Sequence, residues 1–266
     1  MEVFRVEKPI VGMVHLLPLP GSPKYENSSF DDILELAIND AKRLESGGVD
    51  GLIVENLGDV PYLKENVGPE TISAMALVVA DVVKAVKIPV GVNVLRNDAK
   101  AALAIAHIAG GKFIRTNVFT DAVVTDQGII EASAPELLRY RRSLRAGAIK
   151  IFADVHSKHG TLLSPRAIEQ SAKDAAYRGL ADVLIVTGPR TGVEPKLEDL
   201  MQVKKAVPDR PVFVGSGISK ENVVKLLKYA DGAIVGTSLK AGGSVDNPVD
   251  EKRVRALVAA VKRLRR

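Results

Sequence analysis

The chain has 266 residues, and 46% of them are hydrophobic, which is enough for one sizeable packed core. It contains no cysteine, which excludes disulfides, thiolate catalysis and cysteine-based metal sites. No run approaches the roughly 20 apolar residues of a membrane span, so no transmembrane segment is predicted. The first residues, Met1–Arg5, include charges and lack the apolar stretch of a signal peptide. We therefore expect a cytoplasmic protein.

Basic residues exceed acidic residues by 37 to 32, giving a formal net charge of +5. Much of the excess lies near the C-terminus, in Lys252, Arg253, Arg255, Lys262, Arg263, Arg265 and Arg266. A basic helix of this kind could contact nucleic acid or an anionic membrane. Cations near the C-terminal end of a solvated helix are also favoured by its dipole. Because aromatic residues make up only 4% and are not interleaved with basic ones, we expect no nucleic-acid partner.

Strand-like apolar runs alternate with amphipathic helical stretches along the whole chain. The expected strands are Ile10–His15, Gly51–Glu55, Val90–Val94, Phe113–Asn117, Ile149–Val155, Val183–Val186, Val212–Val214 and Ala233–Val235. The expected helices cover residues 31–46, 70–86, 98–109, 134–145, 165–178, 196–206, 219–228 and 251–264. Eight such units predict an α/β fold of the (β/α)8 TIM-barrel type, with an open doubly wound sheet as the alternative. No low-complexity linker interrupts the pattern, so residues 1–266 are expected to form a single domain.

Two connections are longer than the usual loop. Residues 16–29 follow the first expected strand, and residues 118–133 follow the fourth. Both lie at the carboxyl ends of strands, where barrel enzymes place their active sites. Each connection could act as a lid or be surface decoration.

Glycine-rich turns follow the last two expected strands. Gly215-Ser216-Gly217 comes after Val212–Val214, and Gly236-Thr237-Ser238 comes after Ala233–Val235. Glycine lets backbone N–H groups approach a phosphate closely, and paired turns after strands seven and eight form the phosphate site of many barrels. The pair therefore predicts a phosphorylated small-molecule ligand, held at the N–H groups of Gly217 and Thr237. Ordinary turn chemistry is the alternative.

Strand alternation predicts which polar side chains lie inside the barrel. In the fifth strand, the apolar set that begins at Ile149 and Ile151 should face the helices, which leaves the other face for the interior. The same reasoning applies to the third and fourth strands, whereas the first two strands are similarly apolar on both faces. The polar residues predicted to lie inside are His15, Glu55, Asn93, Arg115, Asn117, Lys150, Asp154 and His156.

Burying this many ionisable groups costs free energy unless they pair or take part in chemistry. We favour acid–base catalysis, with Asp154 or Glu55 as the base, His156 as its acid partner, and Lys150 and Arg115 stabilising negative charge. Lys150 is expected to extend towards Asp154. A lowered pKa would alternatively let Lys150 form a Schiff base with a carbonyl substrate. Each residue taken singly could instead belong to a structural ion pair.

A metal site is a further alternative in this region. Asp154 and His156 lie two residues apart on one expected strand face, and Glu55 or His15 could complete a ligand set. The spacing matches no specific metal motif, however, and Lys150 would repel a cation. We therefore expect neither a metal nor another cofactor, and we count His15 among the candidate catalytic residues.

Four segments resemble the BtpA/SgcQ family. They are Val11–Pro23 (VGMVHLLPLPGSP), Asp50–Asn56 (DGLIVEN), Asp154–His159 (DVHSKH) and the turn Gly215–Gly217. The resemblance spans essentially the whole chain and implies a phosphate-binding TIM barrel, similar to the ribulose-phosphate-binding barrels. Cyanobacterial members are named for photosystem I biogenesis as extrinsic thylakoid proteins, and others are encoded with sugar or nucleoside metabolism genes. The family implies no particular reaction, so no catalytic role is carried over to these residues.

Two functions remain open from the sequence. The first is an enzyme, of isomerase, lyase or aldolase type, acting on a phosphorylated sugar or nucleoside-derived metabolite. The second is a non-catalytic assembly factor that binds a protein partner or a membrane surface. The ionisable interior and the glycine turns favour the enzyme, and only the basic C-terminal residues favour the assembly factor. Because barrels commonly associate, we also expect a homo-oligomer, most simply a dimer.

Overall fold

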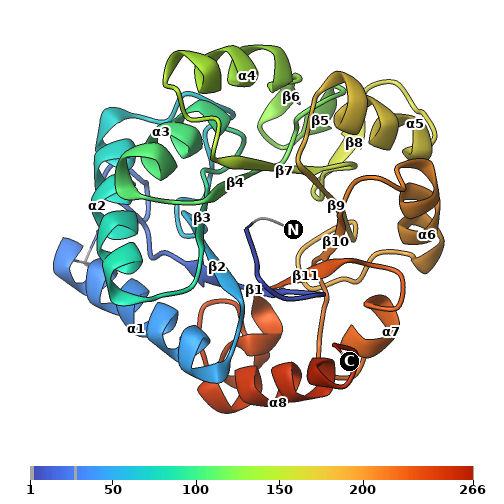
Figure 1. The fold of residues 1–266 in the computed structure, drawn as a ribbon. Helices are drawn as coiled ribbons and strands as arrows, with labels where there is room; N and C mark the ends of the chain where they lie inside the picture. Colours follow the sequence, from blue (N-terminus) through green and yellow to red (C-terminus); the bar gives the residue numbers. More distant parts are fainter. Residues whose placement is uncertain (1–2, 27–28, 266) are drawn as a thin grey trace.

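The computed structural model describes residues 3–26 and 29–265. Its parallel strands form a closed barrel in which each strand pairs with the next and the last returns to the first (Figure 1). In spatial order they are β1 (Ile10–His15), β2 (Gly51–Glu55), β3 (Val90–Asn93), β4 (Phe113–Thr116), β7 (Lys150–Asp154), β9 (Val183–Thr187), β10 (Val212–Gly215) and β11 (Gly232–Val235). The (β/α)8 prediction is confirmed, and the open sheet is excluded.

Helices surround the barrel as an outer ring (Figure 1). They are α1 (Phe30–Gly47), α2 (Pro69–Ala85), α3 (Ala99–Ala109), α4 (Ala134–Ser143), α5 (Ile168–Lys173), α6 (Leu197–Ala206), α7 (Val223–Leu226) and α8 (Glu251–Lys262). A π-helical turn, Asp174–Arg178, continues α5, and two 3-10 turns, Thr237–Leu239 and Ala241–Gly243, follow β11. None of the described helices is long and apolar enough to span a bilayer.

The ends of α1 show how the sequence sets helix boundaries. Ser29 and Asp32 form a capping box, in which each side chain accepts a hydrogen bond from the backbone N–H of the other residue. At the other end, Gly48 has a φ of 93°, a left-handed conformation that glycine adopts without a steric penalty. The capping box therefore sets the start of α1, and Gly48 sets its end.

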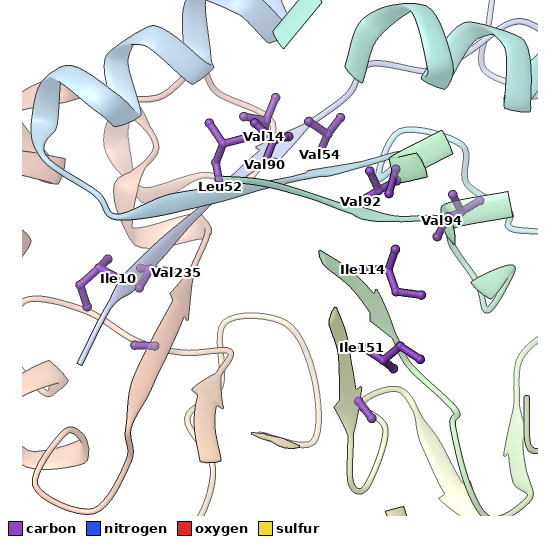
Figure 2. Close-up of a cluster of buried hydrophobic side chains, with 14 of the residues drawn as sticks. Ile10, Val14, Leu52, Val54, Val90, Val92, Val94, Ile114, Ile151 and Val235 are labelled. Carbon is purple, nitrogen blue, oxygen red and sulfur yellow. The ribbon is translucent and has the colours of Figure 1, made fainter. Parts of the chain in front are cut away.

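Aliphatic side chains fill the space between the barrel and the helices. Figure 2 shows part of this layer, which includes Val92, Ile114 and Ile151 from neighbouring strands. These residues were expected to face the helices, and their positions confirm the alternation for β3, β4 and β7 up to Asp154.

Aromatic side chains fill the interior towards the amino ends of the strands. Phe4, Phe113, Phe152 and Phe213 form one cluster, with ring centroids of Phe113 and Phe152 4.5 Å apart. Gly91 leaves room for this packing, because a Cβ there would lie 2.4 Å from the Phe113 ring. The cluster closes one end of the barrel, so any interior site must open at the carboxyl ends of the strands.

The long connection over residues 118–133 contains structure that the sequence reasoning missed. Two short strands, β5 (Val123–Thr125) and β6 (Gly128–Ile130), form a hairpin within it. β5 also pairs with β8 (Gly160–Leu162), which follows β7, in an antiparallel three-stranded sheet. The connections after β4 and β7 are therefore tied together beyond the barrel.

Candidate functional site

A cavity of about 250 Å³ opens at the carboxyl ends of the strands. Its lining comes from the ends of β1, β2, β4 and β11 and from the loops that follow β7, β9, β10 and β11. The lining residues include Met13, His15, Glu55, Arg115, Lys158, Thr191, Ser216, Gly217, Ile218, Ile234, Gly236, Thr237, Ser238 and Arg253. Eight of the predicted site residues therefore share one cavity: His15, Glu55, Arg115, Ser216, Gly217, Gly236, Thr237 and Ser238.

The two glycine-rich turns lie side by side in this cavity. The Ser238 hydroxyl donates a hydrogen bond of 2.6 Å to the carbonyl oxygen of Ile218 and so links them. Gly217 has a φ of 62°, and a Cβ at this position would lie 2.1 Å from the backbone nitrogen of Glu194, so only glycine fits.

Several backbone donors of these turns are not used by the protein. Within the described residues, the backbone N–H groups of Gly217, Ile218, Thr237 and Ser238 donate to no protein acceptor. Arg253, at the start of α8, lines the same cavity and donates from Nε to the carbonyl oxygen of Ser238 at 2.8 Å. Unpaired amides next to a guanidinium suit a phosphate group.

The same cavity also contains two titratable side chains, His15 and Glu55. They end the neighbouring strands β1 and β2. Glu55 is 1% exposed, and its Oε1 lies 3.7 Å from Nε2 of His15. Glu55 Oε2 and His15 Nδ1 are buried without a hydrogen-bond partner among the described residues. Burial, and then the positive charges of Lys240, Lys158 and Arg115, hold the pKa of His15 well below its usual value. His15 is therefore neutral near pH 7, and it does not neutralise Glu55.

Arg115 reaches the cavity from β4 and is held by Asp154 of β7. Arg115 Nε and Nη2 donate to the two carboxylate oxygens of Asp154, both at 3.0 Å. Asn117 Nδ2 also donates to Asp154, at 3.0 Å, and Asn93 Nδ2 donates to Asn117 Oδ1 at 3.2 Å. Burial alone would lower the pKa of Arg115, but the Asp154 carboxylate raises it above its usual value. Asp154 thus accepts three hydrogen bonds, and two of them hold the Arg115 guanidinium in place.

Lys150 lies at the wrong end of β7 for the ion pair expected from the sequence. It begins the strand that Asp154 ends, and four residues of parallel strand span roughly 13 Å. Its Nζ lies 3.7 Å from Oδ1 of Asp182, just before β9. The expected approach of Lys150 to Asp154 is therefore wrong, because alternation gives the face of a residue and not its depth in the barrel.

The lysine that lines the cavity is Lys158, to which the sequence reasoning gave no role. It follows the end of β7, and its Nζ donates to Oγ1 of Thr191 at 3.4 Å. Burial, and then the charge of Arg115, lower the pKa of Lys158. Arg96 holds the backbone of this loop by donating to the Lys158 carbonyl oxygen and, at 2.9 Å, to the Ser157 hydroxyl. The only sequence signal was its place in the segment DVHSKH after a polar strand end.

His156 does not follow the alternation that predicted an inward side chain. Its Nε2 lies 3.2 Å from the hydroxyl of Ser171 on α5, so the imidazole packs against the helical layer. β7 ends at Asp154, and the backbone beyond it no longer alternates as a strand does. Asp154 and His156 therefore do not converge, and the ligand set considered for a metal is not brought together.

Comparisons with solved structures agree with this architecture. Over 96% of this chain and 95% of the other, the fold superposes on a structure described as native KDPGal, with a TM-score of 0.59 and 15% identity. KGPDC from Streptococcus mutans gives a TM-score of 0.58 at 14% identity, covering 97% and 98% of the two chains. Phosphoribosyl anthranilate isomerase from Thermus thermophilus gives 0.57 at 13% identity, covering 97% and 100%. At these identities the similarity establishes the TIM-barrel fold.

Sequence relatives are much closer. An uncharacterised protein of Pyrococcus furiosus is 49% identical over 252 residues, which is 95% of this chain and 94% of that protein. The photosystem I biogenesis protein BtpA of Synechocystis is 45% identical over 260 residues, covering 98% and 90%. An uncharacterised mitochondrial protein of Caenorhabditis elegans is 39% identical over 273 residues, covering 100% and 97%. Residues 6–263 match the BtpA family as a whole, and the chain belongs to that family.

Proposed function

We propose that the protein is an enzyme that acts on a phosphorylated sugar or a nucleoside-derived phosphate by proton transfer, as an isomerase, lyase or aldolase would. The observation that carries the proposal is the Glu55 carboxylate, which is buried, has an unpartnered Oε2 and lines a cavity of about 250 Å³ together with the glycine turns. An unpaired buried carboxylate is costly for stability, and such groups are common where a base is needed.

The phosphate would be held at the turns after β10 and β11. The free N–H groups of Gly217 and Thr237 would donate to its oxygens, and Arg253 would add positive charge at the rim. Phosphate binding would fix one end of the substrate and place its carbon chain over the strand ends, so that the reacting atoms have a defined position. The neighbour named phosphoribosyl anthranilate isomerase supports a phosphorylated sugar, by analogy of fold.

Glu55 would then act as the general base. Its Oε2 would remove a proton from a carbon next to a carbonyl or from a hydroxyl, and return it at a neighbouring atom. Arg115 and Lys158 line the same cavity and would stabilise the negative charge that develops on oxygen. Asp154 would be a positioning residue, because it acts by holding Arg115. Glu55 Oε2 has no hydrogen-bond partner among the described residues and would be available to the substrate.

Binding of phosphorylated compounds tests this function. Isothermal titration calorimetry would measure a panel of sugar phosphates and nucleoside monophosphates, each beside its unphosphorylated counterpart. We expect binding only for phosphorylated members, with conversion of at least one of them followed by ³¹P NMR. A panel without any phosphate-dependent binding would contradict the proposal.

An assembly role is the second candidate, and the 45% identity to the Synechocystis photosystem I biogenesis protein BtpA favours it. The basic C-terminal residues give it less support than the sequence suggested, because Arg253 faces the cavity, Arg255 pairs with Glu251, and Arg265 binds Asp50. Complementation of a Synechocystis strain lacking BtpA, with wild-type protein and with Glu55→Gln, separates the two. Equal rescue by both would favour the assembly role.

A further inference from the structure

We propose that Lys158 is a covalent catalyst, whose Nζ forms an imine with the carbonyl carbon of a phosphorylated ketone or aldehyde. The inference rests on the proposed function, because it places the substrate phosphate at the turns that share the cavity with Lys158. It goes further in two ways: the substrate would be a phosphorylated carbonyl compound, and Lys158 would bond to it covalently and not only stabilise its charge.

The backbone of Lys158 is held in place, whereas its amine makes only a long hydrogen bond. Arg96 donates to the Lys158 carbonyl oxygen and to the neighbouring Ser157 hydroxyl, which holds the loop beside the cavity. At the other end, Nζ donates to the Thr191 hydroxyl at 3.4 Å, the long limit of a hydrogen bond. A nucleophilic amine needs both a fixed position and a nitrogen lone pair that is free to attack.

The charge around Lys158 differs from that around Lys240 and Lys150. Lys240 Nζ lies 2.7 Å from Asp40, and Lys150 Nζ lies 3.7 Å from Asp182, so a carboxylate stabilises each ammonium. In the part of the chain that the structure describes, no carboxylate lies within 4 Å of Lys158 Nζ. Burial and the Arg115 guanidinium disfavour a second cation here and lower the pKa of Lys158, and Arg96 adds to this effect. The Glu55 and Asp154 carboxylates act in the opposite direction but do not reverse the shift. A desolvated lysine beside a cation is the arrangement that yields a neutral, nucleophilic amine.

The chemistry balances with the groups of this cavity. The Lys158 amine adds to the carbonyl carbon, the C–N bond forms, and the carbonyl oxygen takes up a proton to give a carbinolamine. Glu55 accepts the proton that the nitrogen loses and returns one to the oxygen, which leaves as water. The protonated imine then draws electrons from an adjacent bond. Either Glu55 accepts the proton of a C–H bond, or a C–C bond breaks as Glu55 accepts the hydroxyl proton of the fragment that leaves as a carbonyl compound. The resulting enamine takes the proton back from Glu55, and water releases the product and restores the amine. No oxidant, reductant or metal is consumed.

Trapping with pyridoxal 5′-phosphate tests the proposal, since this probe carries both an aldehyde and a phosphate. The protein would be mixed with one equivalent of the probe, reduced with sodium borohydride and digested, and the modified peptide would be identified by mass spectrometry. We expect most of the label on Lys158, and at least tenfold less label on the same peptide when pyridoxal without phosphate is used.

Three variants make the result specific. Lys158→Arg places a cation at this position that cannot form an imine, and Lys158→Met removes the nitrogen altogether; each should lose at least nine-tenths of the label. Lys150→Met, at the opposite end of the barrel, should label as the wild type does. Thermal unfolding of each variant would establish that it is folded. Label spread over surface lysines, with Lys158→Arg labelled like the wild type, would overturn the imine.

Pyridoxine 5′-phosphate, which has no aldehyde, separates the two claims. Its binding by calorimetry reports on the phosphate site alone, whatever happens at Lys158. Binding of this compound without labelling of Lys158 would overturn the imine and leave the proposed function standing. Labelling of Lys158 by pyridoxal as strongly as by its phosphate, with no binding of pyridoxine 5′-phosphate, would support the reactive amine and contradict the phosphate site.

Discussion

His15 and Glu55 face each other across β1 and β2, with His15 Nε2 3.7 Å from Glu55 Oε1, and both keep a buried polar atom without a partner among the described residues. Two such atoms at adjacent strand ends cost stability, because neither regains in the fold the hydrogen bonds that it had with water. The arrangement is reasonable if a substrate supplies the missing partners. It also gives the protein a defined response to pH.

The folded protein should lose stability as the pH falls below about 6.5, the ordinary pKa of histidine. The folded-state pKa of His15 is lowered, mainly by burial, so the unfolded chain takes up a proton in this range that the folded chain does not. Each such proton lowers the free energy of unfolding by at most about 1.4 kcal/mol per pH unit. Urea unfolding at pH 7.5 and 5.5 measures the slope.

The control is His15→Gln, which cannot titrate. His156 and His159 have lowered pKa values as well, so some slope should remain, but it should be smaller than in the wild type. An unchanged slope in His15→Gln would show that His15 is protonated in the fold.

Asp154→Asn should destabilise the protein strongly, by about 3–5 kcal/mol, because it leaves the buried Arg115 guanidinium without its counter-ion. Equilibrium unfolding in urea measures this loss. Arg115→Met combined with Asp154→Asn should recover part of it, since the uncompensated charge is then gone. A stable Asp154→Asn protein with no loss on unfolding would contradict the assignment of Asp154 as the residue that holds Arg115.

Gly217→Ala should abolish phosphate-dependent binding. The new Cβ would lie 2.1 Å from the Glu194 nitrogen and would force the turn apart. Gly128→Ala is the matched control, because Gly128 also has a positive φ, at 93°, but a Cβ there would have no neighbour within 4 Å. Calorimetry would use a sugar phosphate that the wild type binds. Gly217→Ala should lose this binding, and Gly128→Ala should keep the wild-type affinity. Equal affinities would place the phosphate elsewhere.

Arg253→Met should weaken phosphate binding about tenfold, which corresponds to about 1.4 kcal/mol for one charge-assisted contact at an exposed rim. Arg255→Met serves as the control, because Arg255 lies on the same helix but pairs with Glu251. Affinity measured at two salt concentrations should show a smaller salt dependence in Arg253→Met alone. Identical behaviour of the two variants would remove Arg253 from the site.

The fold could be predicted because the alternation of apolar runs with amphipathic stretches repeats along the whole chain. Apolar runs such as Gly51–Glu55 and Ile10–His15 coincide with the observed strands, and the glycine turns after β10 and β11 could be placed because their flanking strands were clear. The hairpin of β5 and β6 was missed, since strands of three residues carry too little periodic pattern to detect. β5 also pairs with β8, which is distant in sequence, and no local pattern reveals such a partner.

The site was predicted less completely, for two physical reasons. Alternation cannot give depth, so Lys150 was placed with Asp154 although it lies near the aromatic end of the barrel. It also fails past the end of a strand, which misplaced His156 and left Lys158 without a role. Which carboxylate keeps a free oxygen depends on tertiary hydrogen bonds, and these distinguish Glu55 from Asp154.

Glu55→Gln provides the most direct test of the central claim, that a free carboxylate in a phosphate-binding cavity performs proton transfer. Glutamine has nearly the same shape and keeps an acceptor oxygen, but it cannot act as a base. For the phosphorylated compound that the wild type converts, binding by calorimetry and turnover by ³¹P NMR would be measured on the same samples. We expect affinity within about threefold of the wild type and a fall in turnover of about 10²–10⁴-fold. Turnover equal to that of the wild type would contradict the account.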